Sequence, residues 1–115
     1  MAYFILEKER KASNSTCYHE FVKGKWELDE CIFWSDDSLY MHDDIMMKIG
    51  FYELLSEVIE GYSPFGIYEI NKDKWEMILN KSYKYGEEIS VAIKELKPWA
   101  ENNFSENEVF TILGI

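Results

Sequence analysis

Residues 109–115 read VFTILGI, and this stretch decides the fold that we expect for the chain. Its apolar and β-branched residues favour a β-strand. An apolar strand at the edge of a sheet would promote aggregation, so we expect this one to lie inside the sheet with a neighbour on each side. The preceding segments must then supply the neighbouring strands and the helices that cover them.

The longest strand pattern upstream is CYHEFVKGKWELDECIFW, in which apolar and polar residues alternate on both sides of Gly24. This alternation predicts a β-hairpin with arms at residues 18–22 and 26–34, and Gly24 supplies the positive φ angle of the turn. In the second arm the side chains of Glu27 and Asp29 are expected to point to solvent.

Two shorter segments also have strand patterns. The run FGIYEI at residues 65–70 predicts one strand, and YFIL at residues 3–6 predicts a short strand near the start of the chain. The polar residues 9–16, which follow the second of these runs, predict a loop.

Helical spacing replaces strand alternation after Asp43 or Asp44, either of which is a favourable N-cap residue. Gly61 is placed to end this helix, because glycine adopts the left-handed conformation common just after a helix. The apolar stripe of this helix comprises Ile45, Ile49, Tyr52, Leu55 and Ile59.

A second helical pattern follows Asn71 or Asp73 and continues to Leu96. The steady phase of its apolar residues slightly favours one long helix to Lys97, whereas Gly86 favours a break into two pieces. Pro98 is expected to end the helix or to start a short turn of helix, because proline lacks the amide hydrogen that a helix interior requires.

These elements predict an α+β fold with a mainly antiparallel sheet of about five strands and two or three helices packed on one face. The length of 115 residues suits one hydrophobic core, and no linker divides the chain. We therefore predict a single domain over residues 1–115.

The charge balance restricts the classes of partner. Lysine and arginine total 12 against 22 aspartates and glutamates, which gives a formal net charge of −10. Nucleic acids and anionic membranes would repel such a chain, so we expect neither as a direct partner. A basic protein is the natural partner for this charge, and no cofactor is expected.

The cysteine content and the first residues of the chain indicate where in the cell the protein is expected. Cys17 and Cys31 are too few for a disulfide framework, so we expect reduced thiols. The opening MAYFILEKERK places its apolar run before its charges, which is the reverse of a signal peptide, and no run reaches the roughly 20 apolar residues of a membrane span. A cytoplasmic protein is expected, as a monomer or a small homo-oligomer.

Residues 26–47 contain seven acidic residues and no lysine or arginine. Carboxylates at the ends of strands and helices accept charge-assisted hydrogen bonds from lysine or arginine side chains of a partner. We therefore predict a partner-binding surface in this segment, with Tyr40 as its apolar anchor. The charged residues of the predicted surface are Glu27, Asp29, Asp36, Asp37, Asp43 and Asp44.

Two alternatives to this surface stay open at the level of sequence. The segment is equally compatible with a solvated loop and a helix cap whose aromatic residues belong to the core. A second acidic surface, formed by Glu53, Glu57 and Glu60, is expected on the first helix, and the sequence does not rank the two surfaces.

Metal binding and catalysis have weaker support. The acidic segment lacks the spacing of a calcium loop and the two-histidine helix of zinc proteases. A zinc site would have to be formed by residues that are distant in sequence and have no recognised ligand spacing. These residues are Cys17, His19, Cys31 and His42. We therefore predict no metal site.

The sequence also lacks the nucleophile elbow of hydrolases and the glycine-rich loops that bind phosphate. No catalytic residue is predicted for this reason. The remaining alternatives are a small cytoplasmic enzyme that uses Asp36, Asp37 or His42, and a structural subunit that associates with itself through exposed aromatic residues.

The chain resembles bacterial toxin-immunity proteins, including those of contact-dependent growth inhibition systems. The resemblance is carried by the acidic central segment, the aromatic-rich composition, the strand-to-helix unit FGIYEINKDKWEMI and the C-terminal FTILGI. It implies a cytoplasmic protein without catalytic activity that binds a cognate toxin domain. Many toxins of this class are nucleases with basic clefts, so the resemblance implies an acidic inhibitor that competes with the phosphate backbone.

Overall fold

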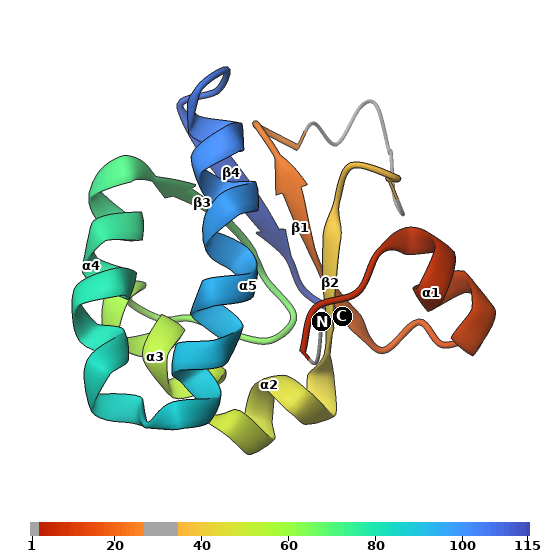
Figure 1. Ribbon diagram of the computed structural model, residues 1–115, viewed down its shortest axis with the longest axis horizontal. Helices are drawn as coiled ribbons and strands as arrows, with labels where there is room; N and C mark the ends of the chain where they lie inside the picture. The colour runs from red at the N-terminus through yellow and green to blue at the C-terminus, as the bar shows by residue number, and fades with distance from the viewer. Residues whose placement is uncertain (1–2, 27–34) are drawn as a thin grey trace.

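A computed structural model of the chain describes residues 3–26 and 35–115 (Figure 1). Four strands form one antiparallel sheet in the order β2-β1-β4-β3, with helices packed against it. The fold is therefore α+β, as predicted. In chain order the described elements are α1 (Glu7–Ser13), β1 (Tyr18–Lys23), β2 (Leu39–His42), α2 (Asp43–Ile49), α3 (Phe51–Val58), β3 (Ile67–Asn71), α4 (Lys72–Ser82), the 3₁₀-helix η1 (Tyr83–Tyr85), α5 (Glu87–Phe104) and β4 (Val109–Leu113).

The C-terminal strand β4 lies inside the sheet, which confirms the prediction made from its apolar sequence. It pairs with β1 on one side and with β3 on the other. Beyond β4 the backbone amides of Gly114 and Ile115 donate to the carbonyl oxygens of Gly66 and Pro64 at 2.8 and 2.9 Å. A Cβ atom at Gly114 would lie 2.4 Å from the Pro64 carbonyl oxygen, so this close approach requires glycine.

The strand predicted at residues 3–6 is wrong, and four strands rather than five make up the described sheet. Residues 3–6 contribute one isolated bridge, between Ile5 and Tyr40. The amides of Tyr3 and Phe4 instead donate to the Glu95 carboxylate on α5, at 3.2 and 2.9 Å, so the segment divides its hydrogen bonds between the sheet and a helix.

Of two further predictions for the N-terminal half, the loop is partly wrong and the first hairpin arm is confirmed as a strand. The polar residues 9–16 were expected to form a loop, but residues up to Ser13 form α1. The first arm of the predicted hairpin is β1, which pairs with β2 and β4. Almost all of the second arm, residues 26–34, lies outside the described residues.

The helix predicted after Asp43 is two helices, α2 and α3, separated by Gly50 with φ of 89°. Periodicity across residues 45–59 is nearly continuous, so the sequence pattern alone does not show this break. The cap is His42, whose Nδ1 atom accepts from the Asp44 amide at 3.1 Å, rather than Asp43 or Asp44. Counting both pieces, the described residues contain five α-helices, not two or three.

Gly86 separates α4 and η1 from α5, so the break that glycine favours prevails over the continuous phase. The prediction that Pro98 ends the helix is wrong. Helix α5 continues through Pro98 to Phe104. Tertiary packing explains this continuation. Leu96 and Ala100 on either side of the proline are buried, and the fully buried Asn103 side chain accepts from the Gly24 amide at 2.9 Å and donates to the Val109 carbonyl at 3.0 Å.

The core lies between the sheet and the helical layer of α2 to α5 (Figure 1). Phe21 of β1 and Phe110 of β4 stack with ring centroids 6.2 Å apart, and Phe4 and Phe51 meet Phe21 edge-on. Helix α1 lies apart from this layer, beside β2 (Figure 1). The helices are therefore not all gathered in the single layer that the sequence predicted.

Replacing Pro98 by alanine should raise the free energy of unfolding by roughly 1–3 kcal/mol, because alanine restores the helix-interior amide hydrogen that proline lacks. Chemical denaturation of the P98A variant measures the change. The control is Pro64→Ala, in a loop where no helical hydrogen bond is recovered. Equal stability of P98A and the wild-type chain would show that α5 is not strained at this position.

Candidate partner-binding surface

Two of the predicted partner-binding residues, Asp36 and Asp37, lie at the tip of a tight turn that leads into β2. We call residues 35–38 the acidic turn. Its ends are joined by a hydrogen bond from the Ser38 amide to the Ser35 carbonyl, at 3.2 Å. Both aspartates are exposed, and neither forms an ion pair with a cation in the described part of the chain.

A buried carboxyl group holds the acidic turn from behind. Glu20 of β1 is only 3% exposed. Its Oε2 atom accepts from the Ser35 amide at 3.1 Å and from the Ser38 hydroxyl at 2.7 Å. Since a buried polar group that loses its partners is costly, these bonds fix both ends of the turn relative to the sheet.

Tyr40, predicted as an apolar anchor for a partner, is fully buried, so this prediction is wrong. Antiparallel pairing places Tyr40 directly opposite Glu20 on the same face of the sheet. Its hydroxyl lies 2.8 Å from the Ser35 carbonyl oxygen and 3.2 Å from Glu20 Oε2. Burial and the neighbouring Glu20 carboxylate raise the pKa of Tyr40, so the hydroxyl stays protonated and supports the acidic turn as a donor.

Trp99 of α5 makes the third attachment of the acidic turn. Its indole Nε1 donates to the Asp37 carbonyl oxygen at 2.8 Å. The same ring packs edge-on against Phe110, with centroids 5.4 Å apart. The sequence predicted no role for Trp99, because it lies 62 positions from Asp37 along the chain and no local pattern indicates a contact at that range.

Asp43 and Asp44 lie at the opposite end of β2 from the acidic turn. The four-residue strand β2 lies between the two pairs, and a strand rises about 3.3 Å per residue, so β2 alone holds them on the order of 13 Å apart. The structure thus does not gather the four aspartates into one cluster. The other two acids of the predicted surface, Glu27 and Asp29, lie outside the described residues.

The second acidic surface, on α3 and just beyond it, is partly neutralised. Glu53, Glu57 and Glu60 are all exposed. Lys84 of η1 donates to Glu57 at 2.7 Å, and this hydrogen bond is the main cause that lowers the pKa of Glu57. A carboxylate already paired within the chain is less available to a partner than those of the acidic turn.

Asp43 is engaged by a histidine from β1. His19 Nε2 lies 2.8 Å from Asp43 Oδ1, and the His19 side chain is fully buried. Burial lowers the pKa of His19, and the hydrogen bond to Asp43 opposes that shift only in part. The neutral ring therefore donates from Nε2, while its buried Nδ1 atom has no hydrogen-bond partner among the described residues.

The described residues show no cluster of three or more histidine, cysteine, aspartate or glutamate side chains placed to hold a metal ion. His19 and His42 lie in adjacent paired strands, but strand alternation points them to opposite faces of the sheet. Cys17 is exposed with a free thiol, and Cys31 lies outside the described ranges. Of the four residues considered for zinc, the three that the structure describes, Cys17, His19 and His42, therefore do not come together as a metal site.

Comparisons with protein-family models, with curated proteins and with solved structures find no match. Within residues 3–26 and 35–115, no helix is both long and apolar enough to cross a bilayer.

Replacing Glu20 by alanine should lower the free energy of unfolding by roughly 1–3 kcal/mol, because the Ser35 amide and Ser38 hydroxyl lose a buried acceptor. Urea denaturation measures this loss. Tyr40→Phe is the matched variant, since it removes one hydroxyl and keeps the buried ring. It should cost less than Glu20→Ala, and the reverse order would show that Glu20 does not hold the turn.

The buried His19 should make the protein less stable in mild acid. Because the pKa of His19 is lowered on folding from its ordinary value of 6.5, the unfolded chain binds the proton first, and stability falls as the pH drops below about 6.5. Stability levels off once the pH passes below the folded-state pKa.

Denaturation midpoints measured across this pH range test the role of His19. The variant His19→Gln should lose this part of the pH dependence. Asp43→Asn should extend the decline to lower pH, because it removes the carboxylate that favours the protonated ring. An unchanged pH profile for His19→Gln would assign the effect to another group.

Proposed function

We propose that the protein is an immunity protein that binds and neutralises a cognate toxin domain, a nuclease with a basic cleft, through an acidic surface that includes the acidic turn. The observation that carries the proposal is the way Asp36 and Asp37 are presented. Both carboxylates are exposed, while the backbone beneath them is fixed by Glu20 and Trp99.

Fixed carboxylates suit tight binding. A turn that is already ordered loses little conformational entropy when a partner docks, so more of the interaction free energy appears as affinity. Asp36 and Asp37 can each accept charge-assisted hydrogen bonds from lysine or arginine, the same donors that hold a phosphate backbone in a nuclease cleft. An acidic inhibitor would therefore compete directly with the substrate.

The net charge of −10 supports the same proposal through association kinetics. Attraction between an acidic surface and a basic cleft raises association rates to ~10⁸–10⁹ M⁻¹s⁻¹ at low salt. Rapid capture is an advantage for an inhibitor that must act before a toxin damages the cell. In this proposal the protein acts in the cytoplasm and performs no catalysis itself.

The experiment identifies a partner and then tests protection. The protein serves as bait in lysate of its native cell at low salt, and each retained basic protein is then expressed alone and together with the bait. We expect one partner to arrest growth when expressed alone and to be harmless beside the wild-type bait. The variant Asp36→Lys with Asp37→Lys should lose protection and slow association at least tenfold at low salt.

The matched control reverses two exposed acids elsewhere, Glu60→Lys and Glu69→Lys, and makes the same change in net charge. It should keep protection. Equal loss in both double variants would show that net charge, rather than the acidic turn, drives capture. A partner whose toxicity the wild-type chain does not relieve would contradict the immunity proposal.

A further inference from the structure

A groove between α4 and the end of α5 is separate from the acidic turn. Two adjoining cavities of about 480 and 440 Å³ make up this groove, and both are lined by Lys72 and Phe104. Volumes of this size lie in the range of sites that bind side chains and small molecules. We call these two cavities together the α4–α5 groove.

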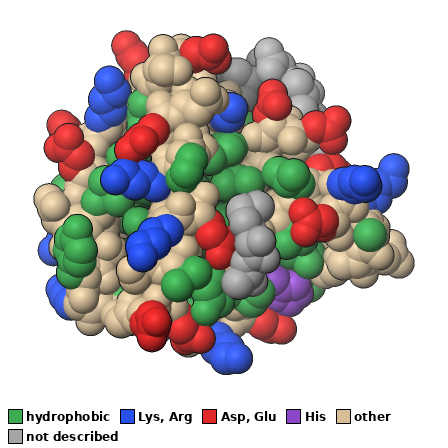
Figure 2. All heavy atoms as spheres, in the orientation of Figure 1, with side chains coloured by type: hydrophobic (Ala, Val, Ile, Leu, Met, Phe, Trp, Pro, Cys, Tyr) green, Lys and Arg blue, Asp and Glu red, His purple; other side chains and the backbone are tan. Residues whose placement is uncertain are grey.

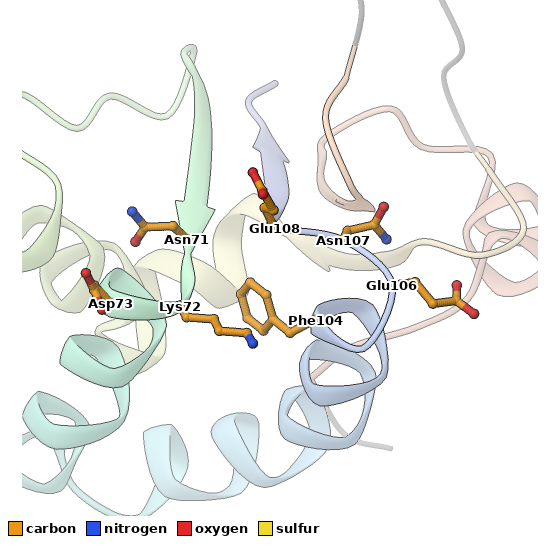
Figure 3. A pocket seen from close by; sticks show the side chains of 7 residues that line it. All are labelled: Asn71, Lys72, Asp73, Phe104, Glu106, Asn107 and Glu108. Atoms are coloured by element: carbon orange, nitrogen blue, oxygen red, sulfur yellow. The ribbon is translucent and has the colours of Figure 1, made fainter.

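The floor of the α4–α5 groove is apolar. Trp75 and Leu79 of α4 and Phe104 of α5 line it, and Phe104 also packs against the core ring of Phe110 at 5.8 Å. Figure 3 shows Lys72 and Phe104 reaching toward each other across the larger cavity, from α4 and from α5. Figure 2 shows hydrophobic side chains between the charged ones on this helical side of the molecule.

The rim of the α4–α5 groove is acidic. Five exposed carboxylates line it against a single cation, Lys72. Among the described residues, only one of the five acids, Glu101, forms an ion pair, with its carboxylate 3.9 Å from Lys97 Nζ. The five acids are Asp73, Glu76, Glu101, Glu106 and Glu108.

An apolar floor with an acidic rim complements one kind of side chain in particular. Arginine and lysine carry a long aliphatic stem that packs on apolar surface and a charged head that stays at the polar edge. Arginine also stacks on aromatic rings. Figure 3 shows the Lys72 side chain of this chain beside the Phe104 ring.

We propose that the α4–α5 groove binds an arginine- or lysine-rich segment of a partner protein, with the aliphatic stems on Leu79 and Phe104 and the cationic heads at the carboxylate rim. This inference rests on the geometry of the groove and does not depend on the proposed function of the acidic turn.

The test titrates the full chain with an octa-arginine peptide and follows backbone amide signals by NMR. We expect the largest shifts at residues 72–79 and 104–108, and none with an octa-glutamate peptide. Shifts concentrated at residues 35–38, or spread evenly over all acidic residues, would overturn the proposal. Spermine that binds the groove as tightly as the peptide would overturn the assignment to a protein segment.

Paired variants separate the groove from general electrostatics. Glu76→Gln with Glu108→Gln removes one rim carboxylate from each cavity and should weaken peptide binding roughly fivefold. Glu60→Gln with Glu69→Gln removes the same charge elsewhere and should leave affinity within about twofold of the wild-type value. Equal weakening by both pairs would overturn the proposal. Because all four side chains are exposed, circular dichroism should show unchanged folding.

Discussion

The burial of β4 is the constraint on which the rest of the structure depends. An apolar strand in the middle of the chain's only described sheet needs a hydrogen-bonding neighbour on both sides and a cover on both faces. β1 and β3 supply the neighbours, and the helical layer covers Phe110 and Ile112. Thr111 on the other face is also fully buried and donates to the Gly24 carbonyl at 2.8 Å, across 87 residues of sequence.

Buried polar groups then select one arrangement around β4. Asn103 joins the end of α5 to Gly24 and Val109, and Glu20 joins β1 to the acidic turn. An apolar core alone tolerates small shifts of one element past another, whereas a buried hydrogen-bonding group is stable only with its own partners in place. The same bonds that stabilise the fold therefore hold the acidic turn in position.

This organisation places two separate features on the surface. The acidic turn presents two exposed carboxylates, and Tyr40 is buried inside the fold beneath it. The α4–α5 groove combines an apolar floor with a carboxylate rim. Both features favour cationic groups of a protein, the partner class that the net charge of the chain also favours.

The sequence by itself determined the α+β class, the interior place of β4, the strands β1 and β3, and the acidic character of the surface. These features depend on composition and on periods of two or 3.6 residues, which neighbouring residues along the chain define. The glycine break at Gly86 was also visible, although the continuous apolar phase slightly favoured a single helix.

Only the tertiary structure decided the features that depend on distant partners. The continuation of α5 through Pro98 depends on buried neighbours, and the division of residues 3–6 between β2 and α5 depends on Glu95. The burial of Tyr40 against Glu20 and the attachment of the acidic turn by Trp99 join residues 20 and 62 positions apart. Hydrogen bonds and packing over such separations leave no periodic signal in the sequence, because each partner is chosen by the fold and not by its neighbours along the chain.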